Sequence, residues 1–238
     1  MLTVRYMICI VLLLTTTPSF ATLMFSEYVE GSSYNKAVEL FNTDSDVDLE
    51  AGGYTIEIFS NGSTAASYSF ALSGVVAQGN TFVISHSRAD QLILEQANLI
   101  TGSLNFNGDD AIVLLQNGTV LDRMGQVGVD PGSAWGNGTV TTQNHTLRRR
   151  AGIVSGDVDT TAAFDPGVQW LGFGVDVFDD LGTHVVDEPL LPPLQPVAAQ
   201  AAVPAPASVW LLAVALIPLG VGRLKTDHFS AQNGLNPV

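Results

Sequence analysis

The fold is decided by residues 105–122, which read NFNGDDAIVLLQNGTVLD. An apolar run from Ala111 to Leu115 is followed by Asn117-Gly118 and then by the run from Thr119 to Asp122. Because both central residues of a type I′ turn need a positive φ angle, Asn-Gly between apolar runs is the strongest short-range signal of a β-hairpin. We therefore predict an antiparallel hairpin closed at residues 117 and 118, in which residue n pairs roughly with residue 235 − n.

Short apolar runs separated by turn residues continue on both sides of this hairpin. They predict further strands at residues 22–29, 36–41, 54–59, 66–72, 81–85 and near 146–148, and residues 170–173 and 178–182 are expected to close the domain. One short helix is expected at residues 87–95, between the strand at 81–85 and the central hairpin, with Ser87 as its N-cap. Since the sequence offers no amphipathic helix of about twelve residues to cross between parallel strands, it predicts an all-β, antiparallel sandwich over residues 22–186.

The pattern also predicts where individual side chains lie. Alternation along residues 22–29 places Tyr28 on the face opposite to Phe25. A turn is expected at Asp130-Pro131-Gly132, and Trp135 follows it in a glycine-rich segment. A ring of this size is expected to be buried in a domain of this length.

The composition is strongly acidic. The chain of 238 residues has 23 Asp and Glu against 9 Lys and Arg, and residues 22–202 keep 22 acidic and 6 basic residues, a net charge of about −16. Such a charge repels phosphates, so nucleic acid is not an expected partner. The basic cluster Arg148-Arg149-Arg150 is predicted to be a solvated strand end. Cys9 is the only cysteine, which excludes an internal disulfide framework.

Residues 1–21 are predicted to form a secretory signal peptide. Arg5 precedes an apolar run from Met7 to Leu14, and Ser19-Phe20-Ala21 has the small residues of a cleavage site. The mature protein would then start at Thr22, and signal peptidase is an expected partner. An N-terminal membrane anchor is the alternative.

The other end of the chain changes composition at residue 187. Residues 187–202 are rich in proline and alanine and predict an extended linker. The apolar span within residues 203–225 has about the 20 residues that a bilayer requires, and Arg223 and Lys225 follow it. These features predict a transmembrane helix with a cytoplasmic C-terminal end, and the alternative is a buried core helix. Residues 226–238 form a short polar tail.

Several stretches occur together in one order along the predicted sandwich. They are residues 26–33 (SEYVEGSS), 35–42 (NKAVELFN), 106–111 (FNGDDA), 124–125 (MG), 128–132 (GVDPG), 135–136 (WG), 145–149 (HTLRR) and 176–184 (DVFDDLGTH). In these stretches, residues 23–186 resemble the bacterial, exported form of the lamin-tail domain. The resemblance implies an immunoglobulin-like sandwich. In bacteria this domain is an accessory module that often accompanies secreted nucleases or other hydrolases and has no agreed ligand.

A second resemblance covers residues 203–225. A VPAPAS head at residues 203–208, the apolar span and the basic residues after it resemble a PEP-CTERM sorting signal, with Ala205 where glutamate is usual. The resemblance implies processing by an exosortase-type membrane enzyme. Residues 226–238 depart from this family, most of whose members end after the basic residues.

Acidic residues in turns provide a candidate calcium site. The hairpin register places Asp109 and Asp110 opposite residues 125–127, and Asp130 lies a few residues further along. Carboxylate oxygens from loops are the ligands that calcium prefers, so these three residues are predicted to converge on one ion. The alternative is that they only form turns. No other cofactor is expected.

No catalytic constellation is recognisable in the sequence. Glu27, Glu30 and Glu39 are interpreted as structural or turn-capping residues, and the histidines have no metal-ligand spacing. We therefore expect a non-catalytic protein, exported to the cell envelope or extracellular matrix, that binds or scaffolds an envelope polysaccharide or protein. The alternatives are a small secreted metal-dependent hydrolase and an accessory domain for extracellular nucleic acid.

Overall fold

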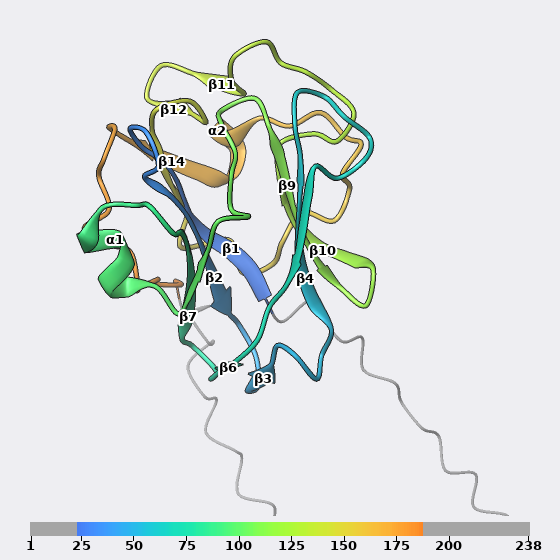
Figure 1. Ribbon diagram of the computed structural model, residues 1–238, viewed down its shortest axis with the longest axis vertical. Coiled ribbons are helices and arrows are strands. Elements are labelled where there is room, and N and C mark those ends of the chain that lie inside the picture. The colour runs from blue at the N-terminus through green and yellow to red at the C-terminus, as the bar shows by residue number, and fades with distance from the viewer. Residues whose placement is uncertain (1–22, 188–238) are drawn as a thin grey trace, which may run out of the picture. The chain divides into compact units, whose positions relative to one another are not determined.

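The structure is a computed structural model that describes residues 23–187 (Figure 1). The predicted signal peptide at residues 1–21 lies outside this range, as do the predicted sorting signal, the tail and nearly all of the linker. Within residues 23–187, no helix is long and apolar enough to cross a membrane. The transmembrane helix predicted in residues 203–225 therefore stays a prediction.

Two β-sheets face each other in residues 23–187 (Figure 1). In this part of the chain the larger sheet has six strands in the order β14-β13-β1-β2-β7-β8. They are β1 (Leu23–Glu30), β2 (Lys36–Asn42), β7 (Thr81–His86), β8 (Leu99–Thr101), β13 (Thr146–Arg149) and β14 (Trp170–Phe173). The smaller sheet, of order β10-β9-β4-β5, is formed by β4 (Tyr54–Phe59), β5 (Tyr68–Ala71), β9 (Ala111–Gln116) and β10 (Thr119–Met124).

Short elements complete the described part of the chain. The strand pairs are β3 (Val47–Asp48) with β6 (Val75–Val76), and β11 (Gly136–Asn137) with β12 (Val140–Thr141). The helices are α1 (Gln91–Gln96) and α2 (Pro166–Gln169).

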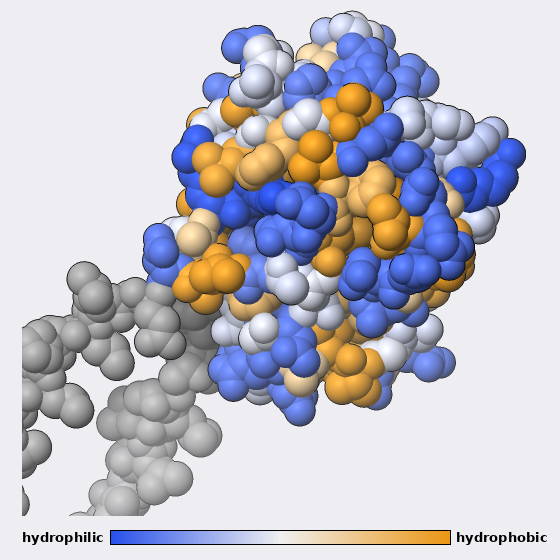
Figure 2. Space-filling view, turned by 90° about the vertical axis from the view of Figure 1, so that its left-hand side faces the viewer, coloured by the Kyte–Doolittle hydropathy of each residue, from blue (hydrophilic) through white to orange (hydrophobic). Residues whose placement is uncertain are grey.

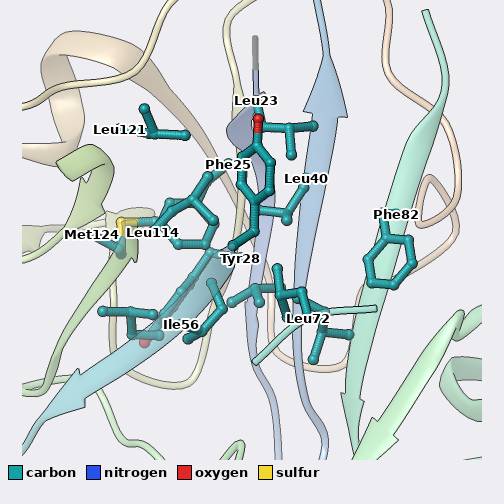
Figure 3. Close-up of a cluster of buried hydrophobic side chains, with 14 of the residues drawn as sticks. Leu23, Phe25, Tyr28, Leu40, Ile56, Leu72, Phe82, Leu114, Leu121 and Met124 are labelled. Carbon is teal, nitrogen blue, oxygen red and sulfur yellow. The ribbon is translucent and has the colours of Figure 1, made fainter. Parts of the chain in front are cut away.

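The hydrophobic core fills the space between the two sheets. Phe25, Tyr28 and Leu40 of the larger sheet pack against Ile56 and Leu114 of the smaller one (Figure 3). None of these five side chains is more than 1% exposed. Burial of apolar area on this scale is the main stabilising term of a domain. The predicted all-β sandwich is confirmed, and it departs from the antiparallel prediction only where β8 pairs with β7 in parallel.

The central hairpin forms as the sequence predicts. Asn117 and Gly118 have φ angles of 48° and 77°, which is the left-handed pair that a type I′ turn needs. Thr119 pairs with Gln116, as the predicted register requires. A β-bulge between Val120 and Asp122 then shifts the register by one residue.

A second bulge overturns the predicted faces of β1. The register between β1 and β2 shifts between Phe25 and Glu27, so the alternation of side chains is reset there. Phe25 and Tyr28 therefore both lie in the core between the sheets, and the prediction that Tyr28 faces away from Phe25 is wrong. Ser26 and Glu27 are left on the outer side, where they meet Glu39 of β2.

The helix starts later than the sequence predicts. Its N-cap is Asp90, whose side chain accepts a hydrogen bond of 2.9 Å from the Leu92 nitrogen. Ser87 is not the cap because the helix begins only at Gln91, four residues later, and the Ser87 nitrogen donates to the Thr101 carbonyl at 3.1 Å. That contact belongs to β8, an unpredicted strand that runs parallel to β7.

Trp135 is buried, as predicted, but outside the main core. It packs with Phe59, Ala111 and Val113 on the outer face of the smaller sheet, and only 6% of it is exposed. Phe164 meets the indole edge to face, with ring centroids 6.0 Å apart. The indole thus closes this outer face.

Candidate functional site

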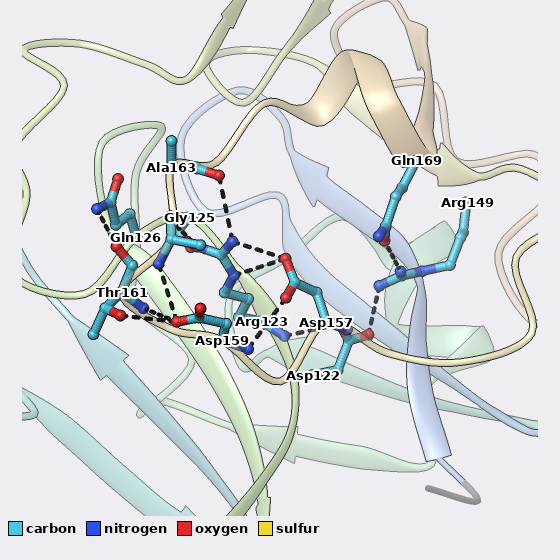
Figure 4. A network of polar contacts seen from close by, with 11 residues as sticks. Asp122, Arg123, Gly125, Gln126, Arg149, Asp157, Asp159, Thr161, Ala163 and Gln169 are labelled. Carbon is cyan, nitrogen blue, oxygen red and sulfur yellow. Dashed lines mark hydrogen bonds and ion pairs between the residues drawn. The ribbon is translucent and has the colours of Figure 1, made fainter. Parts of the chain in front are cut away.

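The most deeply buried ion pair joins the two sheets. Asp122 on β10 contacts the guanidinium of Arg149 on β13 at 2.5 Å, and neither side chain is more than 1% exposed (Figure 4). Asp122 also accepts from the Phe25 nitrogen at 2.7 Å, and Arg149 also donates to Gln169. The guanidinium lies 4.4 Å from the centre of the Trp170 ring. This arrangement joins β1, β10 and β13 to one another and to the α2–β14 segment.

The predicted solvated strand end is therefore wrong for two of its three arginines. Arg149 is buried in that pair, and Arg148 contacts Asp179 at 2.6 Å and Glu27 at 3.5 Å. Only Arg150 is exposed. The acidic partners of Arg148 and Arg149 lie in strands and loops distant in sequence, so the local sequence pattern could not predict these ion pairs.

A second network attaches a loop to β10. The Arg123 side chain contacts Asp157 at 2.8 Å and donates to the Ala162 carbonyl at 2.7 Å (Figure 4). The Asp157 nitrogen in turn donates to Asp122 at 2.8 Å. The charged side chains of these two networks thus contact one another and stabilise the fold.

Two buried carboxyl groups face each other on the outer side of the larger sheet. Glu27 and Glu39 are directly paired across β1 and β2, and their exposed fractions are 1% and 0%. Glu39 accepts from the Ser26 hydroxyl and from the Gly182 nitrogen, each at 2.6 Å, whereas one Glu27 oxygen has no partner within residues 23–187. Burial raises the pKa of Glu27 to about 8 and that of Glu39 to about 7.

These raised pKa values predict that the fold loses stability as the pH rises from 6.5 to 8.5. Unfolded glutamates have already lost their protons there, whereas folded Glu27 and Glu39 lose theirs only near pH 7 to 8. The folded state therefore binds more protons, and the free energy of unfolding falls. Thermal midpoints of the wild type and of Glu27→Gln measure this, and the variant should show the smaller decrease.

The pH window is chosen to leave the histidines out. Burial lowers the pKa of His86 and of His184 below the ordinary value of 6.5. Their contribution to stability rises with pH mainly below pH 6.5 and levels off above it, and it is equal in the wild type and in Glu27→Gln. If the thermal midpoint changed equally with pH in the wild type and in Glu27→Gln above pH 6.5, the pKa of Glu27 would not be raised by folding.

The predicted calcium residues are not brought together. Asp110 accepts hydrogen bonds of 3.0 Å from the backbone nitrogens of Asn61 and Asn107, and Asp130 accepts from Gly132 in its own turn. The Asn61-Gly62 turn lies between them, since a Cβ on Gly62 would come within 2.7 Å of the Asp130 nitrogen. Within residues 23–187, no three His, Cys, Asp or Glu side chains are placed to hold a metal ion.

Calcium binding at Asp109 and Asp110 stays a prediction with a direct test. One Asp109 carboxylate oxygen is buried without a hydrogen-bond partner among the described residues, so it is the atom that could coordinate a calcium ion. Bound calcium would raise the thermal midpoint in millimolar calcium over that in chelator, and Asp109→Asn would abolish the rise. Equal midpoints for the wild type would remove the metal site.

An open polar groove lies beside Asp110. Its volume is about 500 Å³, within the range of small-molecule sites. The lining is formed by Ser60, Asn61, Ser67, Tyr68, Asn105 and Asn107, together with the more deeply buried Phe106 and Asp110. Two loops supply most of these residues, one in the β4–β5 hairpin and one just before β9. This groove is the candidate binding site.

A hollow of about 490 Å³ beside α1 is lined in part by Leu92, Val177, Phe178 and Leu181, and Figure 2 shows the face on this side of the domain. Apolar side chains there form separate patches with polar ones between them. Leu92 and Ile100 are among the exposed apolar residues, at 61% and 51%. Nothing in residues 23–187 indicates what would cover the hollow beside Leu92, and scattered side chains such as Ile100 are ordinary on a protein surface.

Comparison with known families agrees with the predicted resemblance. Residues 16–128 match the model of the family described as Lamin Tail Domain. The comparison with curated proteins gave no match, and the comparison with solved structures gave none either. The match runs from the predicted signal peptide to the turn after β10, whereas the sandwich continues through β13 and β14. Residues 16–128 are thus similar to the lamin-tail domain, and the chain around them folds as an immunoglobulin-like sandwich.

Proposed function

We propose that residues 22–186 are a non-catalytic binding and scaffold domain of an exported protein of the cell envelope or its extracellular matrix. The observation that carries this proposal is that the clustered charged side chains form ion pairs within the sandwich. Asp122 with Arg149, and Arg123 with Asp157, join segments of the sandwich to one another. Groups engaged in this way hold a fold together, which suits a scaffold.

The route to the envelope rests on the two ends of the chain. Signal peptidase would cleave before Thr22, and an exosortase-type enzyme would recognise the sorting signal at residues 203–225 in the membrane. The support is the order of the segments: a signal peptide, a sandwich, a proline-rich linker and an apolar span with Arg223 and Lys225 after it. The partner of the sandwich is an envelope polysaccharide or protein.

Nucleic acid is not a partner in this proposal. Residues 22–202 carry a net charge of about −16, which repels phosphates. The basic cluster at residues 148–150 does not offset this charge, since Arg149 and Arg148 already contact acidic side chains.

Deleting residues 203–238 tests the proposal. We expect the truncated protein to appear in the medium as a soluble, folded domain that begins at Thr22, while the full chain stays with the envelope fraction. Circular dichroism of the released protein should show β structure, and mass spectrometry should show the new N-terminus.

A matched deletion separates the sorting signal from the tail. Removal of residues 226–238 alone leaves residues 203–225 in place and should leave the protein in the envelope fraction. Release by this shorter deletion would contradict the role given to the apolar span. Retention of the protein that lacks residues 203–238 would contradict it as well.

A further inference from the structure

Two loops of the sandwich form the groove beside Asp110, and one carboxylate ties them together. The Asp110 oxygens accept from the Asn61 nitrogen in one loop and from the Asn107 nitrogen in the other, both at 3.0 Å. Across the groove, the Asn105 carboxamide donates to the Tyr68 hydroxyl at 3.0 Å. The walls are therefore held in place before any ligand arrives, which lowers the entropic cost of binding.

The groups that remain for a ligand are neutral and both donate and accept hydrogen bonds. Within the described residues, the carboxamides of Asn61 and Asn107 make no internal hydrogen bond, and both residues are exposed. Asn105 keeps its carboxamide oxygen free, because its nitrogen is the atom bonded to Tyr68. A carboxamide offers two donors and one acceptor oxygen, so it suits a ligand rich in hydroxyl groups.

The base of the groove is aromatic. Phe106 is 4% exposed, and its ring lies 5.1 Å from that of Tyr28, which fixes it against the core. Tyr68 is half-buried and packs against the same core. Flat rings beside hydrogen-bonding amides match a ligand with apolar C–H faces and polar edges.

Charge narrows the class of ligand further. No Lys, Arg or His lines the groove, and its one carboxylate already accepts two backbone hydrogen bonds. An anionic polymer would meet Asp110 without a compensating cation, and the acidic domain would repel it at longer range. A neutral ligand avoids both costs.

We propose that the groove lined by Asn61, Asn105 and Asn107 binds a neutral saccharide chain. Sugar hydroxyls pair with the three carboxamides, and a pyranose ring lies over Phe106 and Tyr68. The open form of the groove lets a polymer pass through. This inference rests on the proposed function as a binding domain and names its ligand class.

The test titrates the full chain, purified in a detergent without a sugar headgroup. The probes are maltohexaose, cellohexaose and chitohexaose, with hexagalacturonate as the anionic comparison, and calorimetry reads binding. We expect a dissociation constant below about 1 mM for at least one neutral hexaose, the strength of a modest single site, and no binding of hexagalacturonate. Asn107→Ala and Asn105→Ala should each weaken binding at least fivefold.

Asn137→Ala is the matched control, since Asn137 is an exposed asparagine of β11 away from the groove. It should bind like the wild type, and Asn107→Ala, whose side chain makes no internal hydrogen bond in residues 23–187, should keep the wild-type thermal midpoint. Absence of binding to every neutral hexaose, equal binding of hexagalacturonate, or no effect of Asn107→Ala would each overturn the saccharide site. The proposed function is tested separately by the fractionation of the protein that lacks residues 203–238, and its outcome does not depend on the titration.

Discussion

Trp135→Ala is expected to lower the free energy of unfolding by about 3–5 kcal/mol, the range for emptying a large buried aromatic site. The indole is 6% exposed and packs with Phe59, Ala111 and Val113 on the outer face of the smaller sheet. Its ring also lies so close to Gly125 that a Cβ there would come within 2.8 Å. Because the surrounding backbone belongs to strands, it cannot collapse to fill the space.

Chemical denaturation of the wild type and the variant measures this loss. Val175→Ala serves as the control, since Val175 is 49% exposed and its truncation should change stability by less than about 0.5 kcal/mol. A loss under about 1 kcal/mol for Trp135→Ala would show that the satellite cluster on this face does not stabilise the sandwich.

Asp122→Asn is expected to cost about 3–5 kcal/mol, the range for breaking a buried ion pair from one side. The substitution keeps the size of the side chain and an oxygen for the Phe25 nitrogen, but it removes the charge beside Arg149. The guanidinium, at 1% exposure, would then be buried without a counter-ion. The cost comes from the uncompensated charge and from the Arg123 and Asp157 nitrogens, which lose their acceptor to the amide NH2, since a buried pair as a whole adds little net stability.

Two further variants show that the loss comes from the isolated charge. Asp122→Asn combined with Arg149→Met should recover part of it, because the unpaired guanidinium is then absent. Asp179→Ala breaks the contact with Arg148 at a side chain that is 80% exposed, and it should cost less than about 1 kcal/mol. A double variant no more stable than Asp122→Asn would exclude this explanation.

The sequence predicts those parts of the fold that depend on neighbouring residues. Asn117-Gly118 determines its own turn and the register beside it, because both residues must adopt positive φ angles. The bulge at Phe25 and Glu27 arises instead from pairing with β2, and no local pattern announces it. The choice of Asp90 over Ser87 as N-cap is not announced locally either, because serine and aspartate both favour that position.

The candidate site shows the same division. The hairpin register correctly places Asp109 and Asp110 at the open end, but it cannot show that the Asn61-Gly62 turn lies between them and Asp130. The groove joins loops that are some 45 residues apart in the sequence. Its only signal beforehand is the asparagine content of both loops, which also suits ordinary turns.

The contacts of β1 bear on the order in which the sandwich can assemble. The Phe25 backbone forms hydrogen bonds with the side chains of Asp122 and Arg149, which lie 97 and 124 residues later in the chain. Chains dominated by such distant contacts fold slowly, because long loops must close before the contacts form. A fragment that stops at residue 128 contains Asp122 but lacks Arg149, and it leaves one side of β1 without its neighbour β13. The unit that folds is thus longer than the segment that sequence similarity marks, because β1 gains its neighbour β13 only when nearly the whole domain has been synthesised.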